Sequence, residues 1–430
     1  MKMDSTVSFR DALRFWIKLG FISFGGPTGQ IAIMHTELVT DRKWISESRF
    51  LHALNYCMLL PGPEAQQLAI YIGWLMHGAL GGIVAGAFFV IPSIFILWGL
   101  SAIYVLYGKI FWIASFFYGL KAAVLAIVAA AVLRIGKKAL RNAALISIAV
   151  LAFAAIFFLK VPFPWIILTA GLIGFVGGKL WPKQFQTPKE TDPQDSVRFI
   201  NSAKSSIPRA IQVLLICLGL WWTPVLLIGL YLGWDHTLFH EGLFFSKAAM
   251  VTFGGAYAVL PYVSQQAVEH FGWLRTGQMM DGLGLAETTP GPLIMVLQFV
   301  GFMGGWNRPG SLPPLVAATL GALITTWVTF VPCFLWIFLG APHIEQLRHK
   351  ARLSSALSAI TAAVVGVVLN LAVWFFIHAI FPVANQVDWF LLVCAAIGFV
   401  GMVKLKWNMI AVVFASGLLG ILFKYITGVL

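Results

Sequence analysis

Apolar positions fall into long runs that short polar loops separate. In residues 1–180, seven apolar pieces follow one another, at about 9–36, 47–60, 64–77, 79–107, 112–134, 142–159 and 163–178. A helix rises 1.5 Å per residue, so about 20 apolar residues span the ~30 Å hydrocarbon core of a bilayer. The pattern predicts an all-α polytopic membrane protein.

Two features interrupt these runs. The second and third pieces hold only about 14 residues each, too few to cross ~30 Å, and Pro61-Gly62-Pro63 joins them. This arrangement predicts a re-entrant hairpin. Gly25-Gly26-Pro27 stands inside the first piece, where a regular helix does not continue without cost. The first piece is therefore predicted to break into two half-helices.

The same features return in the second half at a constant offset. Adding 229 takes Lys18 to Lys247, Phe24-Gly25-Gly26 to Phe253-Gly254-Gly255, Trp44 to Trp273, and Pro61-Gly62-Pro63 to Pro290-Gly291-Pro292. Beyond the loop 305–314 the offset becomes 240, which pairs Pro92 with Pro332, and later 246, which pairs Lys160 with Lys406. The offsets predict two homologous repeats, at 1–180 and 235–430.

A polar linker and one extra helix are predicted between the repeats. Residues 181–210 show no periodic apolar face, and residues 211–233 are long and apolar enough to cross a bilayer once. That single helix has no counterpart in the first repeat. If each repeat crosses the membrane an even number of times, one added crossing gives the second repeat inverted topology.

Composition excludes a soluble globule. Of the 430 residues, 60% are hydrophobic and 10% charged, and the mean hydropathy is +0.87. The net charge of +13 would suit nucleic acid, but Lys and Arg fall mainly in the short loops between apolar runs. The positive-inside rule explains that placement, so we expect a multi-pass membrane protein that binds no nucleic acid.

Loop charges favour the inverted arrangement independently. A basic cluster follows the fifth piece of the first half, whereas the matching loop 377–388 carries no Lys or Arg. Before that piece the pattern reverses, because Lys109 stands alone in the first half against Arg348, Lys350 and Arg352 in the second. Positive charge on opposite loops indicates opposite orientation and places the linker in the cytoplasm.

The glycine breaks are candidate anion sites. A helix that begins near Thr28 directs free N–H groups and a positive dipole end at the break of Gly25 and Gly26. Gly254 and Gly255 repeat this site. Further candidates at the two Pro-Gly-Pro turns are Gly62, Gly291, Thr288 and Thr289. The alternative is that these glycines only permit close helix packing in the membrane.

Charged residues inside apolar sequence complete the candidate site. Lys18 and Lys247 each lie six residues before the Phe of a break, where an ammonium costs ~2.5–3.5 kcal/mol on insertion scales. We predict a cationic pair near an anion path; snorkelling to an interface is the alternative. Glu64 and Glu287 flank the Pro-Gly-Pro turns and are predicted proton carriers, although Glu64 also suits a helix-capping charge.

The tryptophans, the cysteines and the absence of enzyme motifs limit the possible functions further. Trp44 and Trp273 are interpreted as interfacial anchors. The four cysteines lie apart without C-x-x-C spacing, so metal or redox chemistry and a cofactor are not expected. The chain also carries no H-E-x-x-H, G-x-S-x-G or Walker pattern, so an enzyme is not expected.

Four stretches together resemble the chromate ion transporter family in its long form with two fused halves. They are SFGGPTGQIAIMHTELV, LLPGPEAQQLA, TFGGAYAVLPY and ETTPGPLIMV. The resemblance implies an inner-membrane carrier that exports chromate, in exchange for or driven by protons, with sulfate as a competitor. The residues themselves lead only to an oxyanion carrier. A sulfate or other oxyanion transporter, an anion channel, and a homodimeric assembly are left open.

Overall fold

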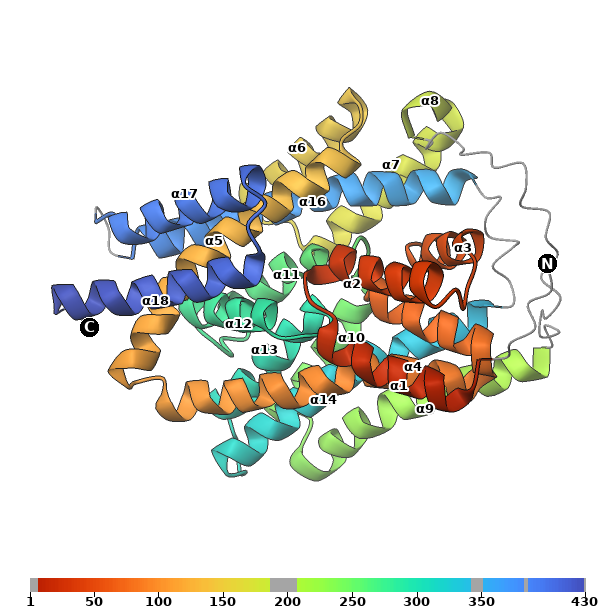
Figure 1. Cartoon of the computed structure of the whole chain (residues 1–430), viewed down its shortest axis with the longest axis horizontal. Helices are drawn as coiled ribbons and strands as arrows, with labels where there is room; N and C mark the ends of the chain where they lie inside the picture. Colours follow the sequence, from red (N-terminus) through yellow and green to blue (C-terminus); the bar gives the residue numbers. More distant parts are fainter. Residues whose placement is uncertain (1–6, 186–206, 342–350, 383–385, 429–430) are drawn as a thin grey trace.

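A computed structural model describes residues 7–185, 207–341, 351–382 and 386–428. Every regular element in these ranges is a helix, which confirms the all-α prediction (Figure 1). The first half comprises α1 Phe9–Ile22, α2 Gly26–His35, the π-helix η1 Thr36–Asp41, α3 Glu47–Cys57, α4 Glu64–Tyr107, α5 Phe111–Ala139, α6 Ala143–Phe157 and α7 Phe163–Leu180.

The remaining helices complete the chain. They are α8 Pro182–Phe185, α9 Ile207–Leu232, α10 Thr237–Val251, α11 Ala256–Gln265, the π-helix η2 Gln266–His270, α12 Thr276–Thr288, the 3₁₀-helix η3 Leu293–Met295, α13 Val296–Asn307, α14 Pro314–Gly340, α16 Ala351–Ile380, α17 Trp389–Lys404 and α18 Met409–Thr427. Most of the predicted linker lies outside the described residues.

Seven helices in the described part are long and apolar enough to cross a membrane: α4, α5, α7, α9, α14, α16 and α18. This confirms a multi-pass membrane protein. The extra helix predicted at 211–233 is α9, which begins earlier, at Ile207. Its first turn therefore takes up the end of the predicted linker. Large apolar side chains such as Leu230 are exposed on α9, as expected for a helix that faces lipid.

Helix α4 combines two of the predicted pieces across a sharp bend. The backbone leaves helical geometry at His77 and Gly78, where Gly78 has φ 63° and ψ −153°. Gly73 and Gly81 then face each other so closely that a Cβ on either would overlap the other's carbonyl oxygen. The first segment of α4 consequently folds back on the second, and glycine is required at this contact.

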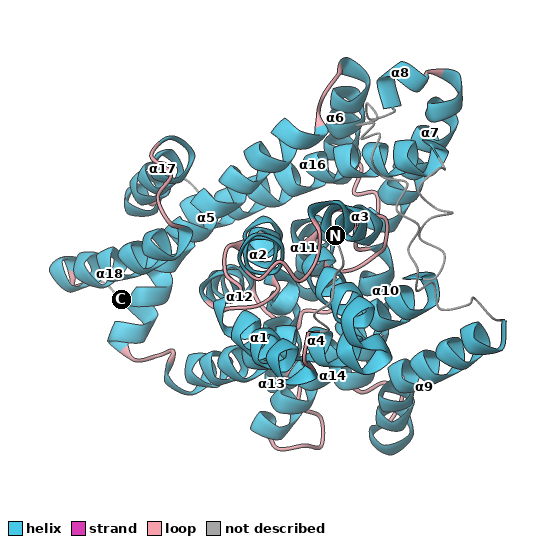
Figure 2. Cartoon of the chain, turned by 45° about the vertical axis from the view of Figure 1, so that its right-hand side comes forward, coloured by secondary structure: helices cyan, strands magenta, loops and turns pink. Residues whose placement is uncertain are grey.

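The helices form two bundles with a central layer between them. One bundle joins α5, α6 and α7 to α16, α17 and α18, and the other contains α1, α4, α9, α10, α13 and α14. The short helices α2, α3, α11 and α12 lie between the two bundles (Figure 2). Glycines let backbones approach in the first bundle, since Gly119 of α5 contacts Gly420 of α18. All the predicted breaks lie at or beside the central layer.

Candidate functional site

The breaks predicted at the two Gly-Gly pairs are present. Helix α1 ends at Ile22 and α2 begins at Gly26, while α10 ends at Val251 and α11 begins at Ala256. The φ angles are 86° at Gly25, 68° at Gly26, 79° at Gly254 and 92° at Gly255. Few residues other than glycine adopt these φ values. The two Gly-Gly pairs therefore mark where α1 and α10 end.

The N-termini of α2 and α11 have no side-chain cap. Their N-cap residues are Gly25 and Gly255, and in the described part no side chain bonds the first turns' N–H groups from that position. Uncapped N–H groups and the positive end of the helix dipole favour an anion. The two breaks are adjacent, since a Cβ on Gly255 would lie 4.0 Å from Cγ of Pro27.

Each Pro-Gly-Pro turn binds the break of the opposite half. The Gly62 N–H donates to the Thr252 carbonyl at 2.8 Å, and the Gly291 N–H donates to the Ser23 carbonyl at 2.7 Å. Both donors and both acceptors are 229 residues apart. The two backbone hydrogen bonds are therefore reciprocal, and they tie all four interruptions into one centre.

A side chain of α4 and a side chain of α14 each pack against the glycine of one Pro-Gly-Pro turn. The Ser93 hydroxyl of α4 donates to the Pro290 carbonyl, and a Cβ on Gly291 would overlap that hydroxyl. Cys333 of α14 takes the matching place, with its Sγ 3.0 Å from where a Cβ on Gly62 would stand. Gly62 and Gly291 have φ 123° and 98°. Only glycine fits either turn.

Buried amides and a hydroxyl line the centre, and the motif search on the sequence missed them. The Gln30 side chain donates through Nε2 to the Gly291 carbonyl, and the Gln67 Nε2 donates to the Pro61 carbonyl at 2.8 Å. Ser23 Oγ and Gln67 Oε1 are buried and bond no described residue. Unsatisfied polar atoms cost about 1–3 kcal/mol each, so their presence favours a polar ligand here.

The predicted threonines differ in what they offer. Thr28 lies exposed in the first turn of α2. The hydroxyls of Thr288 and Thr289 donate to the carbonyls of Leu285 and Ala286, within their own helix. In this arrangement both hydroxyl protons are used in bonds to the backbone of α12.

The predicted lysines have different surroundings. Lys18 donates to Glu37 of η1, and Arg42 donates to the other carboxylate oxygen at 3.0 Å. The hydrogen bond from Lys18, reinforced by Arg42, lowers the pKa of Glu37 although partial burial opposes it. Lys247 is exposed and forms no ion pair within the described ranges. No described contact brings the two lysines together, and their cationic pair stays a prediction.

Helix α5 carries three cations that each interact electrostatically with a carboxylate of another helix. Lys138 interacts electrostatically with Glu64, the partly buried first residue of α4. Glu287 is only 3% exposed and accepts a hydrogen bond from the Tyr257 hydroxyl. The Arg134 guanidinium lies over the Tyr257 ring, with its Cζ 5.9 Å from the centroid.

The third cation and carboxylate are Lys121 and Asp281, and Asp281 belongs to α12 of the central layer. Asp281 of α12 accepts a hydrogen bond from Tyr104 at 2.8 Å and interacts with Lys121. Arg134 and Lys138 belong to the basic cluster that the sequence pattern assigned to the loop after the fifth piece, and Lys121 was passed over because no motif contains it.

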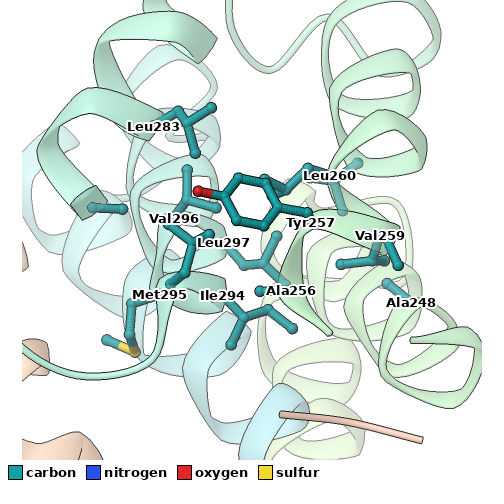
Figure 3. Packing of buried hydrophobic residues seen from close by; sticks show 14 of the residues in the cluster. Ala248, Ala256, Tyr257, Val259, Leu260, Leu283, Ile294, Met295, Val296 and Leu297 are labelled. Carbon is teal, nitrogen blue, oxygen red and sulfur yellow. The ribbon is translucent and has the colours of Figure 1, made fainter. Parts of the chain in front are cut away.

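Tyr257 links the second break to these charges. Its ring lies among Leu260, Val296 and Leu297, and its hydroxyl points toward the helix that carries Leu283 (Figure 3). That helix is α12, which also carries Glu287. An aromatic hydroxyl thus connects the start of α11 with a buried carboxylate and an arginine.

The prediction that Trp273 anchors the protein at a membrane interface is wrong. Its ring is only 2% exposed and stacks on Phe271 with centroids 4.3 Å apart and planes 5° apart. Trp273 therefore packs inside the protein, because aromatic neighbours cover the surface that an interfacial residue would show to lipid.

Comparison with known proteins gives a consistent result. The sequence profile described as Chromate transporter matches residues 10–175 and 240–421. The chromate transport protein of Pseudomonas aeruginosa is 31% identical over 423 residues, which cover 96% of this chain and 92% of that protein.

Two further relatives align over most of their length. The chromate transport protein of Cupriavidus metallidurans is 28% identical over 365 residues, 84% of this chain and 81% of that protein. The probable chromate transport protein of Synechococcus elongatus is 29% identical over 367 residues, 85% of this chain and 84% of that protein. No solved structure matches the chain.

Proposed function

Because this chain belongs to the chromate transporter family, we propose that it is a secondary carrier that moves a tetrahedral oxyanion, chromate first, across the membrane. Membership makes the protein a membrane transporter and not an enzyme. The identity of the anion and the direction of transport are part of the proposal.

The reciprocal hydrogen bonds from Gly62 to Thr252 and from Gly291 to Ser23 carry the proposal. Each half holds the broken segment of the other, so neither break moves without disturbing both. A carrier needs such a shared centre, because access must alternate around one site. The uncapped starts of α2 and α11 supply N–H donors for a dianion, together with the dipole.

We propose in addition that residues 1–180 and 235–430 are inverted repeats, separated by the linker 181–210 and the helix at 211–233. Matching local conformations support the repeat. Lys160 and Lys406, paired by the offset, both have left-handed backbone, with φ 51° and 57°. The Trp44 N–H donates to the Leu38 carbonyl and the Trp273 N–H to the Ala267 carbonyl, each at 2.8 Å. The single helix α9 supplies the inversion.

The anion site in this proposal comprises the backbone around Gly25, Gly26, Gly254 and Gly255, with Gly62, Gly291 and the neighbouring threonines at its edge. Arg134 and Lys121 add positive charge from α5. Chromate and sulfate share tetrahedral shape and double charge, so sulfate is the second candidate substrate. A channel would use the same centre without alternating access.

Export is the direction we propose, across the inner membrane and with proton coupling through Glu64 and Glu287. An inside-negative potential of 100 mV releases ~2.3 kcal/mol per charge when an anion leaves the cell, so a dianion gains twice that. Carboxylates near a dianion make physical sense if they hold protons while it is bound.

Protection against thermal unfolding tests the proposed ligand. Purified protein should melt at a higher temperature in chromate than in chloride of equal ionic strength, because a ligand at 100 times its Kd stabilises by about 2.7 kcal/mol. Ser23→Ala should weaken the protection, whereas Ser147→Ala, an exposed serine of α6, should keep it. Equal melting temperatures in chromate and chloride would contradict an oxyanion site.

A further inference from the structure

Glu241 of α10 is a buried carboxyl group with no partner. The residue is 0% exposed, and both Oε1 and Oε2 lack a hydrogen bond to any described residue. An ionised carboxylate in such surroundings costs far more than a neutral acid, which costs only its unmade hydrogen bonds. Packing alone does not favour glutamate here, since a hydrophobic residue would fill the space without that cost.

Two glycines shape the space around the carboxyl group. A Cβ on Gly304 of α13 would overlap Oε1, and a Cβ on Gly321 of α14 would stand 2.8 Å from Oε2. Gly321 also contacts Gly301 of α13 so closely that each Cβ would overlap the other's carbonyl oxygen. The carboxyl group therefore occupies a notch that absent side chains create, inside the α13–α14 contact, and the packed helices leave it no room for hydration.

No charged neighbour compensates the group. The helices packed against α10 are α9, α11, α13 and α14. Their titratable residues, with those of α10 itself and of the nearby loops, are Arg209, Cys217, Tyr231, Asp235, His236, His240, Lys247, Tyr257, Tyr262, Arg275, Arg308 and Cys333. None of them forms a hydrogen bond or ion pair with Glu241 in the described part. Helix α13 contributes no titratable side chain.

A cavity lies close to the notch. Its volume is about 460 Å³, and Trp273, Arg275, Asn307 and Arg308 are among its lining residues. Trp273 also reaches the notch, because its Cγ lies 3.2 Å from the point where a Cβ on Gly304 would stand. Trp273 is thus shared by the cavity and the notch.

We propose that Glu241 is a proton-binding site, which holds its proton and stays neutral in the notch at the α13–α14 contact. The role in a transport cycle rests on the proposed carrier function. The proton site itself does not depend on which anion is carried.

A metal cation fits the notch poorly. Hard cations take about six or more oxygen ligands, whereas glycine Cα atoms and an indole ring form the walls next to the carboxyl group. The single ligand that this space admits without rearrangement is a proton.

Infrared spectroscopy of the full-length protein tests the protonation state directly. At neutral pH, where exposed glutamates are ionised, the wild type should show a neutral-carboxyl band that Glu241→Gln lacks. Glu269→Gln, an exposed glutamate of η2, is the matched control and should leave the band unchanged. A band that persists at full height in Glu241→Gln would overturn the proposal.

Melting temperatures provide the second readout. The folded protein keeps a proton that the unfolded chain loses above about pH 4.3, so wild-type stability should fall relative to Glu241→Gln as pH rises. We expect the difference to grow by a few degrees between about pH 5 and about pH 8, and to be the same in sodium and potassium. Parallel pH curves, or a dependence on sodium, would contradict a proton site.

If Glu241→Gln does not fold, the variant Glu241→Asp, with its shorter acidic side chain, tests the proposal instead. Glu241→Asp keeps the proton but withdraws it from Gly304 and Gly321, so the neutral-carboxyl band should shift in frequency. An unshifted band would assign it to another residue and reject Glu241. Neither readout uses an anion. A failure of the carrier proposal in the chromate experiments can therefore be told apart from a failure of the proton site.

Discussion

Lys18 and Lys247 occupy matching sequence positions but have different partners. Glu37 and Arg42 surround Lys18, whereas Lys247 has no ion-pair partner in the described part. We predict that Lys247→Gln weakens chromate binding about tenfold, equivalent to ~1.4 kcal/mol. Lys18→Gln should have a smaller effect because Glu37 already offsets its charge. Binding to purified protein measures both, and unchanged affinity in both variants would remove the lysines from the anion path.

Glu64 and Glu287 exist in one half each, since the matching positions hold Leu293 and Met58. A site that only holds a dianion gains nothing from nearby carboxylates. If they bind protons in the loaded state, anion and proton affinities must be linked reciprocally. We predict that Glu287→Gln or Glu64→Gln flattens the pH dependence of transport while chromate still binds. Wild-type pH profiles in both variants would assign these residues a structural role.

The Pro-Gly-Pro turns are the elements that tolerate change least. Gly291→Ala places a Cβ on the Ser93 hydroxyl at φ 98°, and such left-handed strain alone costs about 1–3 kcal/mol. We predict a lower melting temperature and lost transport. The control is Gly99→Ala in α4, where a Cβ meets no atom within 4 Å. If the two variants melt and transport alike, the turn does not hold the opposite break.

Sequence patterns predicted the helices and their interruptions because glycine and proline act locally. Gly78, for example, bends α4 at the boundary between two predicted pieces. Contacts between distant segments were not predictable, since the bond from Gly291 to Ser23 and the notch around Glu241 depend on residues far apart in the chain. Glu241 belongs to no sequence motif, and the notch that buries it is formed by Gly304 and Gly321 of other helices. Trp273 was misjudged because Phe245, which also stacks on its ring, comes from a separate helix, α10.

The whole molecule divides into two bundles that each combine both halves. Helices α5–α7 of the first half join α16–α18 of the second, and α1 and α4 join α10, α13 and α14. The breaks lie between the bundles. A relative movement of the bundles would therefore act on both breaks at once, as alternating access requires.

Labelling from the two sides of the membrane tests the inversion at this scale. Cysteines introduced at Asp192 and Asn385, both outside the described residues, should react with an impermeant reagent from opposite sides, Asp192 from the cytoplasm. The expectation follows from the loop charges, because Lys and Arg cluster in loops that are not equivalent in the two halves. Labelling of both positions from one side would remove the inverted repeat and leave the four interruptions without their proposed symmetry.

Counterflow in proteoliposomes tests the central claim most directly. Vesicles loaded with unlabelled chromate and diluted into a trace of labelled chromate should accumulate label transiently above equilibrium, because a carrier exchanges one bound anion for another at the same centre. Loading with sulfate should also drive accumulation if sulfate shares that centre, and Gly291→Ala should abolish it. Label that only equilibrates, without overshoot and without saturation, would show a channel and contradict the carrier.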